Sequence, residues 1–333
     1  MENKTLLSPS PEQGLSEKKA SELEMRSSTQ CPICGQNDVA DYIHAPDRLH
    51  GRQQEYSLVR CANCSLVWLH DPPKPEDMGA HYTAAYDRFI AGAGEHAEAR
   101  WRGRQANLTK YKQAGALLDL GCSSGSFLGS MRGDSWKLFG IEMSRESAKV
   151  AEAKTGAEVF VGEILDAPFK SDMFDVITCF DVLEHLYEPQ RVMKKVADWL
   201  KPGGIFYVQV PNIDSAEARV FGRYWQGLEL PRHLFHYSPK SLRTLGSMAG
   251  LSEVSIVSER NQTIETSVRY LVDKGARKMG ITRTALVNSG KPGLPWRACR
   301  KLMRMTVLKV CVALLPAVGS GEAIHGIFRK GDR

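Results

Sequence analysis

The middle of the chain alternates short apolar runs with longer segments in which apolar and polar residues are mixed. The apolar runs predict strands at residues 116–120, 137–142, 158–161, 176–180, 205–210, 253–258 and 324–329. The mixed segments predict helices at residues 126–132, 144–155, 190–200 and 239–249. Strands that alternate with helices indicate an α/β fold, in which helices cover both faces of a mainly parallel sheet.

The remaining segments suggest how the chain is divided. Residues 1–29 are rich in Ser, Glu and Lys and predict a disordered leader. A small cysteine-containing module is expected at 30–72 and a linker with one or two helices at 73–114. The α/β core then covers 115–258, and a basic helical insertion at 259–319 precedes a final strand and tail at 320–333.

The first strand of the core ends in a glycine-bracketed turn. Asp119, Gly121, Ser123 and Gly125 occupy alternate positions there, and the next strand ends in Glu142. This pattern is typical of a nucleoside-binding half-site, in which glycines let the backbone approach the ligand and the acid accepts hydrogen bonds from ribose hydroxyls. The spacing does not match the dinucleotide fingerprint G-x-G-x-x-G, which argues against NAD.

The turn resembles motif I of the class I S-adenosylmethionine (SAM) methyltransferases, with Ser123 in place of the usual middle glycine. Residues 162–169, 174–186 and 200–204 are similar to further motifs of that family, in the same order. The resemblance covers about residues 115–258. It implies a SAM-dependent methyltransferase with a Rossmann-like sheet, a small N-terminal zinc-ribbon-like module and a C-terminal helical insertion.

The resemblance also implies which residues contact SAM. Glu163, which replaces the usual Asp, and Ile164 would flank the adenine, and the strand containing Cys179 would lie beside the methionine moiety. The full set of expected cofactor contacts is Asp119, Gly121, Ser123, Gly125, Glu142, Glu163, Ile164 and Cys179.

Two C-x-x-C pairs, Cys31 with Cys34 and Cys61 with Cys64, are separated by 26 residues. Four thiolates on two tight turns can close a tetrahedron around Zn²⁺. A closed four-sulfur site leaves no open coordination position, so we expect a structural zinc that serves folding or substrate docking. A redox-active pair or unliganded thiols are the alternative.

A zinc module before such a core resembles two groups of enzymes. One contains sugar C-methyltransferases and related small-molecule enzymes, and the other contains ribosomal-RNA guanine methyltransferases. The long separation of the cysteine pairs and the segment 231–239 favour the first group, which implies a small-molecule or glycan-type acceptor such as a nucleotide- or lipid-linked sugar. RNA methylation is the alternative. The module has no basic run, so nucleic acid is not expected as a partner. A non-catalytic SAM-binding scaffold is a further alternative.

Methyl transfer to a hydroxyl or a carbon acid requires a base. His185, His233 and His236 are the candidates, because they follow the fourth and fifth strands, where ligands enter an open sheet. In the alternative interpretation, His233 and His236 only brace the loop before a helix that has Ser238 as its N-cap and begins at Pro239.

The net charge of +6 is unevenly distributed. Residues 259–318 contain twelve Lys or Arg and three Asp or Glu, a net of +9, which leaves −3 for the rest of the chain. Within this segment Arg297, Arg300, Lys301 and Arg304 would share one helical face. This face predicts a solvated surface, contact with an anionic membrane surface, or a platform for a phosphate-bearing substrate. With no apolar run of about 20 residues and no apolar N-terminal signal, we expect a cytoplasmic protein, with peripheral contact at the inner membrane surface.

Overall fold

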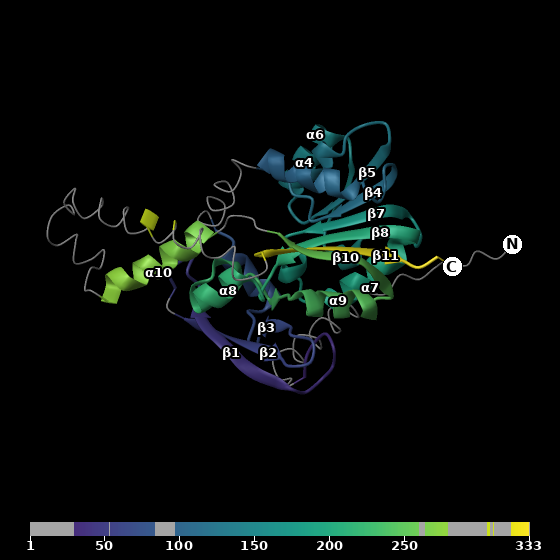
Figure 1. Ribbon diagram of the computed structural model, residues 1–333. Coiled ribbons are helices and arrows are strands. Elements are labelled where there is room, and N and C mark those ends of the chain that lie inside the picture. Colours follow the sequence, from purple (N-terminus) through teal and green to yellow (C-terminus); the bar gives the residue numbers. More distant parts are fainter. Residues whose placement is uncertain are drawn as a thin grey trace, which may run out of the picture.

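A seven-stranded sheet forms the centre of the computed structural model, which describes residues 30–52, 54–83, 97–259, 264–278, 305–306, 309 and 321–332 (Figure 1). The strand order is β10-β11-β8-β7-β4-β5-β6. The strands are β4 (Gly115–Leu120), β5 (Trp136–Glu142), β6 (Glu158–Val161), β7 (Phe174–Phe180), β8 (Leu200–Pro211), β10 (Leu251–Glu259) and β11 (Ala323–Lys330). All seven predicted strands are confirmed, and β11 is antiparallel to both of its neighbours.

Helices cover both faces of this sheet. On one face lie α4 (Ala97–Leu108), α5 (Ser126–Ser130) and α6 (Arg145–Thr155), and on the other lie α7 (Pro189–Trp199) and α9 (Pro239–Met248) (Figure 1). The four helices predicted in the core are confirmed. α9 begins as expected, with Ser238 as its N-cap in a capping box with Ser241 and with Pro239 in the first turn. The α/β fold class is therefore confirmed.

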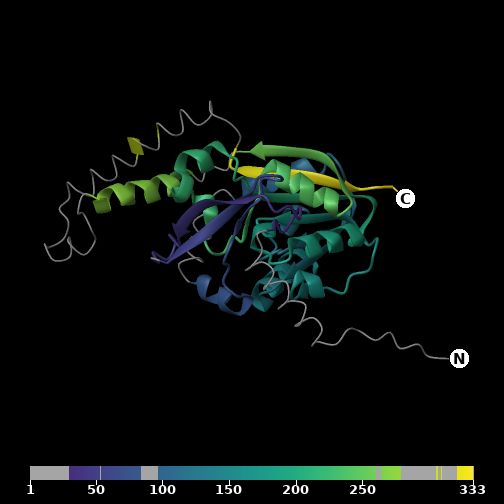
Figure 2. The same cartoon turned by 90° about the horizontal axis from the view of Figure 1, so that it is seen from below.

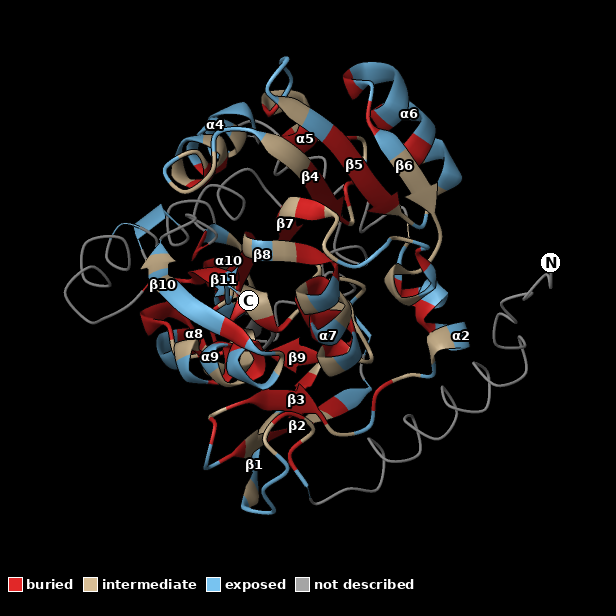
Figure 3. Cartoon of the chain, turned by 90° about the vertical axis from the view of Figure 1, so that its right-hand side faces the viewer, coloured by how far each residue is buried: buried red, intermediate tan, exposed pale blue. Residues whose placement is uncertain are grey.

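Alternate residues of the buried strands point to the two faces. Leu117, Val176 and Ile205 pack toward α4, α5 and α6. Their neighbours Leu118, Ile177 and Phe206 belong to the core on the α7 side. Figure 3 shows the strands as a largely buried layer between more exposed helices. A sheet that is buried on both sides explains why its strands appear in the sequence as continuous apolar runs.

A second, four-stranded sheet has the order β1-β2-β3-β9. β1 (Val39–Pro46), β2 (Glu55–Cys61) and β3 (Val67–Leu69) come from the cysteine module, whereas β9 (Phe235–His236) comes from the loop after β8. β3 pairs with β9 through Val67 opposite His236 and Trp68 opposite Phe235. In Figure 2, seen from below, this sheet lies in front of the large one. The module therefore shares a sheet with the core, which the sequence analysis did not anticipate.

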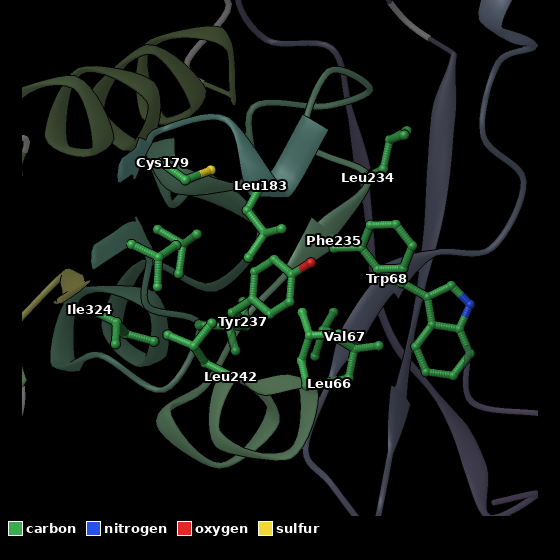
Figure 4. Packing of buried hydrophobic residues seen from close by; sticks show 14 of the residues in the cluster. Leu66, Val67, Trp68, Cys179, Leu183, Leu234, Phe235, Tyr237, Leu242 and Ile324 are labelled. Carbon is green, nitrogen blue, oxygen red and sulfur yellow. The ribbon is translucent and has the colours of Figure 1, made fainter. Parts of the chain in front are cut away.

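The apolar core is also continuous between the two sheets. Figure 4 shows Trp68 of β3 packed near Phe235, with Tyr237 and Leu183 of the core beyond it. Trp68, Phe235 and Tyr237 are at most 1% exposed. Burial of this size stabilises the junction strongly, because each large apolar side chain contributes about 1.5–3 kcal/mol when it leaves water.

Several short elements connect these layers. They are α2 (Pro75–Met78), the 3₁₀ turns η1 (Gly79–His81), η3 (Ile164–Asp166), η4 (Leu183–His185), η5 (Gly222–Tyr224) and η6 (Gln226–Leu228), and the helices α8 (Ala216–Phe221) and α10 (Ile264–Lys278). α10 lies within the predicted basic insertion. The expected basic face of Arg297, Arg300, Lys301 and Arg304 lies outside the described residues. In the described part of the chain, no helix has the length and apolar character needed to cross a bilayer.

Candidate functional site

The glycine turn after β4 has the backbone geometry that its residues predict. Gly121 has a φ of +68°, and a Cβ atom there would lie 2.6 Å from a methyl group of Val182. Gly125 has a φ of +73°, and its Cβ would lie 3.0 Å from the backbone of Ala151 in α6. Both positions therefore require glycine. Ser123 also lies in the left-handed region, with a φ of +48°.

Glu142, at the tip of β5, holds this turn through its carboxylate. One carboxylate oxygen accepts a hydrogen bond from the backbone N–H of Ser123 at 2.9 Å, and the other accepts from the N–H of Ser144 at 2.8 Å. Each oxygen has a second lone pair, so ribose hydroxyls can still donate to the same group. Glu142 can thus shape the turn and bind a ligand at once.

An exposed apolar side chain marks the next part of this edge. Met143 follows Glu142 directly and is 73% exposed, the largest value among the exposed apolar side chains described. Ile164 and Glu163, expected at the adenine, are half-buried just beyond β6. A flat apolar ring bound here would cover the exposed methionine. The sequence analysis did not single out Met143, although its place after the strand-terminal acid was available as a signal.

The side chains of Asp119 and Cys179, which were also expected to contact SAM, are buried. Asp119 is 4% exposed, and one carboxyl oxygen accepts a hydrogen bond from the Thr178 hydroxyl at 2.6 Å. Burial raises the pKa of Asp119 to about 7, and its hydrogen bond with Thr178 links β4 to β7. Cys179 has no exposed surface and lies in the apolar core (Figure 4). The expectation that Cys179 contacts SAM is therefore corrected: its side chain points into the protein.

Arg104 of α4 was missed in the sequence analysis. Its guanidinium is 2% exposed, donates to Asp181 at 3.2 Å and to Gln209, and lies over the rings of Trp101 and Phe180. Its Nε and Nη1 atoms are buried and have no hydrogen-bond partner in the described part of the chain. Buried donors of a charged group are costly when unpaired, so these two atoms mark a place where an anionic group would be stabilised.

The three candidate bases come together where the loops after β7 and β8 meet. The rings of His185 and His233 are 4.7 Å apart between centroids, and those of His233 and His236 are 6.1 Å apart. His185 is half-buried, whereas His233 and His236 are 5% and 1% exposed. The three candidates therefore lie together, and the exposed fractions of their side chains distinguish them.

Hydrogen bonds determine which nitrogen of each ring carries the proton. His233 donates from Nδ1 to the Gly227 carbonyl at 2.9 Å, and His236 donates from Nε2 to the Leu228 carbonyl at 3.0 Å. Both rings thus brace the turn η6, as the alternative interpretation of the sequence held. The Nε2 atom of His233 also lies 3.4 Å from the carboxylate of Glu229.

His185 has a different arrangement. Its Nδ1 lies 3.0 Å from the carbonyl oxygen of Arg232, which can only accept, so Nδ1 carries the hydrogen. In the neutral ring, Nε2 then holds the lone pair. The Tyr82 hydroxyl lies 3.3 Å from Nδ1, and the Tyr82 side chain is 41% exposed. Tyr82 is thus a further residue of this end that the sequence analysis did not find, because it precedes the core by many residues.

Burial keeps the three imidazoles neutral. Together with a smaller contribution from neighbouring histidines, it lowers the pKa of His185 and of His236 to about 4 and that of His233 to about 3. The adjacent Glu184 is fully buried; burial and the charge of Asp181 raise its pKa well above the usual range. Near neutral pH the histidines are therefore unprotonated, which is the form that accepts a proton.

The four cysteines of the N-terminal module form a cluster that fits zinc. The sulfur atoms of Cys31 and Cys64 are 3.5 Å apart, those of Cys34 and Cys61 are 3.6 Å apart, and all four lie within 4.8 Å of one another. Tetrahedral coordination with Zn–S distances of about 2.3 Å requires sulfur separations of about 3.8 Å. The donor set and its spacing therefore fit this ion.

The two C-x-x-C turns have the same backbone geometry. The N–H of Gly35 donates to the Cys31 carbonyl at 3.0 Å, and the N–H of Ser65 donates to the Cys61 carbonyl at 3.0 Å. Gly35 and Ser65 both have positive φ values, of +69° and +63°. Two matched turns that point their thiols at one centre are what a four-sulfur site requires.

Glu184, His185 and His233 form a second group with potential ligand atoms within 4.8 Å of one another. A carboxylate and two imidazoles suit a divalent cation such as zinc or iron. The same three side chains also suit proton transfer, so their geometry alone fits either chemistry.

Comparisons with known proteins identify the family to which this chain belongs. Residues 93–256 match the family described as "Methyltransferase domain". The ubiquinone biosynthesis O-methyltransferase of Ralstonia nicotianae is 30% identical over 176 residues, which cover 47% of this chain and 74% of that protein. The chain therefore belongs to the class I SAM-dependent methyltransferases, and it is an enzyme of that class.

Other relatives match shorter parts. The ubiquinone biosynthesis O-methyltransferase of Pectobacterium atrosepticum is 33% identical over 29% of this chain and 42% of its own length. The demethylmenaquinone methyltransferase of Bacillus licheniformis is 25% identical over 41% of this chain and 60% of its own length. Among solved structures, a SAM-dependent methyltransferase from Archaeoglobus fulgidus aligns with a TM-score of 0.49 and 15% identity, covering 74% of this chain and 99% of that one.

Proposed function

We propose that this methyltransferase acts on a hydroxyl or an acidic carbon of a small molecule, with His185 as the general base. The half-buried His185 carries the proposal, because its Nδ1–H is held by the Arg232 carbonyl and its Nε2 is left to accept a proton. His233 and His236 are more deeply buried and brace η6. The names of the relatives, which refer to ubiquinone and menaquinone biosynthesis, support a small-molecule acceptor.

The donor end supplies groups that fit each part of SAM. Glu142 would accept hydrogen bonds from the ribose, and Met143 and Ile164 would cover the faces of the adenine. The two unpaired N–H groups of Arg104 suit the methionine carboxylate. SAM supplies an activated methyl group on its sulfonium, so the protein mainly has to position the two partners and exclude water.

The acceptor end would then perform one proton transfer. As the acceptor oxygen or carbon attacks the methyl group, the acceptor's proton moves to Nε2 of His185, and the charge on the imidazolium is opposed by the nearby Glu229 carboxylate. Tyr82 would contact the acceptor, because its ring is exposed beside His185. Once the product leaves, the imidazolium returns its proton to water, since its pKa of about 4 lies well below neutral pH.

The finer acceptor class is proposed from a cavity next to this end. It lies between the cysteine module and the loop after β8 and is lined by Arg48, Arg223, Trp225, Glu229 and Tyr270 among others. Arg48 stacks on the Tyr224 ring at 4.2 Å, and its pKa is lowered by burial and by the charge of Arg223. Cationic and aromatic groups together favour a glycan-type acceptor that carries phosphate, such as a nucleotide- or lipid-linked sugar, over a neutral quinol.

We also propose that Cys31, Cys34, Cys61 and Cys64 hold a structural Zn²⁺, on the geometry given above. From its charge, we further propose that the basic insertion of a cytoplasmic enzyme contacts an anionic membrane surface. Co-sedimentation with phosphatidylglycerol vesicles, compared with neutral phosphatidylcholine vesicles, would test it.

The test of the base compares His185→Ala with His44→Ala, a substitution of an exposed histidine in the cysteine module. His185→Ala should lower kcat by about 10²–10⁴-fold, the usual contribution of a general base, and leave the SAM dissociation constant unchanged. His44→Ala should leave both unchanged. Acceptors to screen are nucleotide-linked sugars and catechol-type phenols. Full turnover of His185→Ala with any acceptor that the wild type methylates would refute the assignment.

A further inference from the structure

We propose that Asp47, in the cysteine module, is a positioning residue for the acceptor base. It acts through two segments that contact His185, residues 81–83 and Arg232, and it makes the module part of the acceptor site. This inference rests on the proposed function of His185. It extends that proposal by assigning the module a role in turnover beyond support of the fold.

The Asp47 carboxylate is fully buried at the end of β1. Oδ1 accepts the backbone N–H of His50 at 3.2 Å, and Oδ2 accepts Nδ1–H of the His50 ring at 2.8 Å. A carboxylate is rarely buried without charged or hydrogen-bonded partners, because desolvation of the charge is costly. Its further neighbours therefore indicate what the group is used for.

Asp47 holds the segment that carries Tyr82 through His50. His50, oriented by Asp47, accepts at Nε2 the hydroxyl hydrogen of Thr83, with the two atoms 2.8 Å apart. His81, on the other side of Tyr82, accepts at Nδ1 a hydrogen bond from Arg52 at 3.1 Å, and that nitrogen lies 3.6 Å from Asp47 Oδ2. The link from Asp47 through His50 to Thr83 limits where the Tyr82 hydroxyl can lie.

Asp47 also neutralises Arg232, the residue whose carbonyl orients His185. Arg232 is 1% exposed, its Nη1 lies 3.9 Å from Asp47 Oδ1, and the same nitrogen donates to the His81 carbonyl at 3.3 Å. The Arg232 carbonyl accepts Nδ1–H of His185 at 3.0 Å. The carboxylate of Glu229 also lies beside Arg232, with 3.4 Å between Oε1 and Nε. Removing the charge of Asp47 would leave Glu229 as the counter-charge of Arg232 and would weaken the contact between the module and the loop that fixes the His185 tautomer.

The two contacts of His185 Nδ1, with the Tyr82 hydroxyl and with the Arg232 carbonyl, therefore depend on the same buried carboxylate. None of these contacts involves the glycine turn or Glu142. The geometry thus separates an effect on turnover from an effect on SAM binding, and this separation makes the inference testable.

The test uses Asp47→Asn in the full-length protein, because asparagine keeps the shape of the side chain and removes its charge. We expect kcat to fall at least about tenfold, since small misplacements of a reacting group are costly. The SAM dissociation constant and the zinc content of the purified protein should stay at wild-type values. Asp41→Asn, which removes an exposed carboxylate from β1, the strand that precedes Asp47, should change none of the three.

A double-mutant cycle distinguishes positioning from general support of the fold. If Asp47 acts through His185, adding Asp47→Asn to His185→Ala should lower kcat no further than His185→Ala alone. His50→Gln changes the link from Asp47 to Thr83 but keeps the charge of Asp47 beside Arg232. It should give a smaller loss than Asp47→Asn, and it replaces Asp47→Asn in the cycle if that variant does not fold.

Two results would overturn the inference. One is that the losses of kcat caused by Asp47→Asn and His185→Ala add up in the double variant. The other is that Asp47→Asn lowers SAM affinity and kcat in parallel. Full turnover of Asp47→Asn beside an impaired His185→Ala would refute the positioning role alone. Full turnover of His185→Ala would refute the proposed base, and the positioning role with it.

Discussion

The donor end and the acceptor end of this enzyme are built in different ways. At the proposed donor end, Gly121, Glu142 and Ile164 lie at or just after the ends of three strands that are close together in both sequence and space. At the proposed acceptor end, Tyr82, His185 and Arg232 come from three distant segments, and Asp47, which follows β1 of the second sheet, lies beside Arg232. The donor site is local and the acceptor site is assembled over the whole chain.

This difference follows from what each end must recognise. The donor is the same molecule throughout the family, so one strand-turn-helix arrangement with backbone contacts suffices. Acceptors differ among enzymes with a common core, and the parts that bind them lie in loops and added modules. A substitution should therefore damage one end and spare the other, and the following predictions test that separation.

The largest effect is expected at the acceptor end, from Cys61→Ser. Binding of structural zinc is worth about 10–16 kcal/mol in small zinc domains, comparable with the whole stability of many proteins. Loss of one thiolate should release the metal, unfold the β1-β2-β3 region and abolish turnover. Zinc content, measured by mass spectrometry, should fall to background, while calorimetry should still detect SAM binding. Normal turnover without zinc would contradict a structural role for the metal.

Glu142→Gln should damage the donor end alone. Its amide can accept only one of the two backbone N–H bonds, which leaves Ser123 or Ser144 facing a donor. We expect SAM affinity to fall by about 10–100-fold, equal to roughly 1.4–2.8 kcal/mol, with kcat at saturating SAM nearly unchanged. Calorimetric titration measures the first quantity, and Glu146→Gln in the exposed first turn of α6 is the matched control. A reduced kcat with unchanged affinity would show that the two ends are not separable.

The buried histidines should make the acceptor end sensitive to acid. His236 has a pKa of 6.5 in the unfolded chain and about 4 when folded. Between these values the unfolded state binds a proton that the folded state does not, so the free energy of unfolding should decrease by up to about 1.4 kcal/mol per pH unit as the pH falls. Above pH 6.5 this contribution is constant.

The measurement compares denaturant unfolding of the wild type and of His236→Gln at pH 7.5, 6 and 5. The variant should be less stable at pH 7.5, and the difference should narrow as the pH falls, because glutamine does not titrate. The comparison of two proteins removes the opposite contribution of Asp119, whose raised pKa favours the folded state in acid. A constant difference would show that His236 is not kept neutral by folding.

Ser123→Gly should have the smallest effect. The left-handed conformation of Ser123 costs about 1–2 kcal/mol for a residue with a side chain, and glycine would remove this strain. Its greater freedom in the unfolded chain offsets about 0.4–1 kcal/mol of that gain. The melting temperature should therefore rise by a few degrees at most, and SAM affinity should stay within about twofold, since the Ser123 contact with Glu142 uses the backbone. A large loss of affinity would mean that the Ser123 hydroxyl binds the cofactor.

The donor end was easier to predict from the sequence than the acceptor end. The strands and the turn at Gly121 were predictable because burial on both faces and positive φ angles select particular residue types locally. The pairing of β9 with β3 was not, because a two-residue strand has no periodicity and its partner is far away in the chain. His185, His233 and His236 were identified by their positions after strands, but only the exposure and the hydrogen bonds of each ring could distinguish the candidate base from the two that brace η6.

Arg104 and Cys179 show the limit for single residues. Cys179 lies on the expected strand, but alternate side chains point to opposite faces, and its side chain points into the core. Arg104 was missed because nothing in a polar helix distinguishes a buried arginine from its exposed neighbours. In both cases the direction of one side chain decides the role, and that direction is set by tertiary packing.

The hairpin formed by β10 and β11 has a consequence for how this enzyme could change. Glu259 and Ala323 are register partners in neighbouring strands, so the chain leaves the sheet and re-enters it at the same place. The length of the intervening chain is therefore not constrained by the sheet, and the entropy of closing such a loop grows only slowly with its length. Segments of other lengths could replace the intervening chain without changing the pairing of β10 with β11. This junction is therefore a place where the substrate specificity of the enzyme could change while its sheet stays the same.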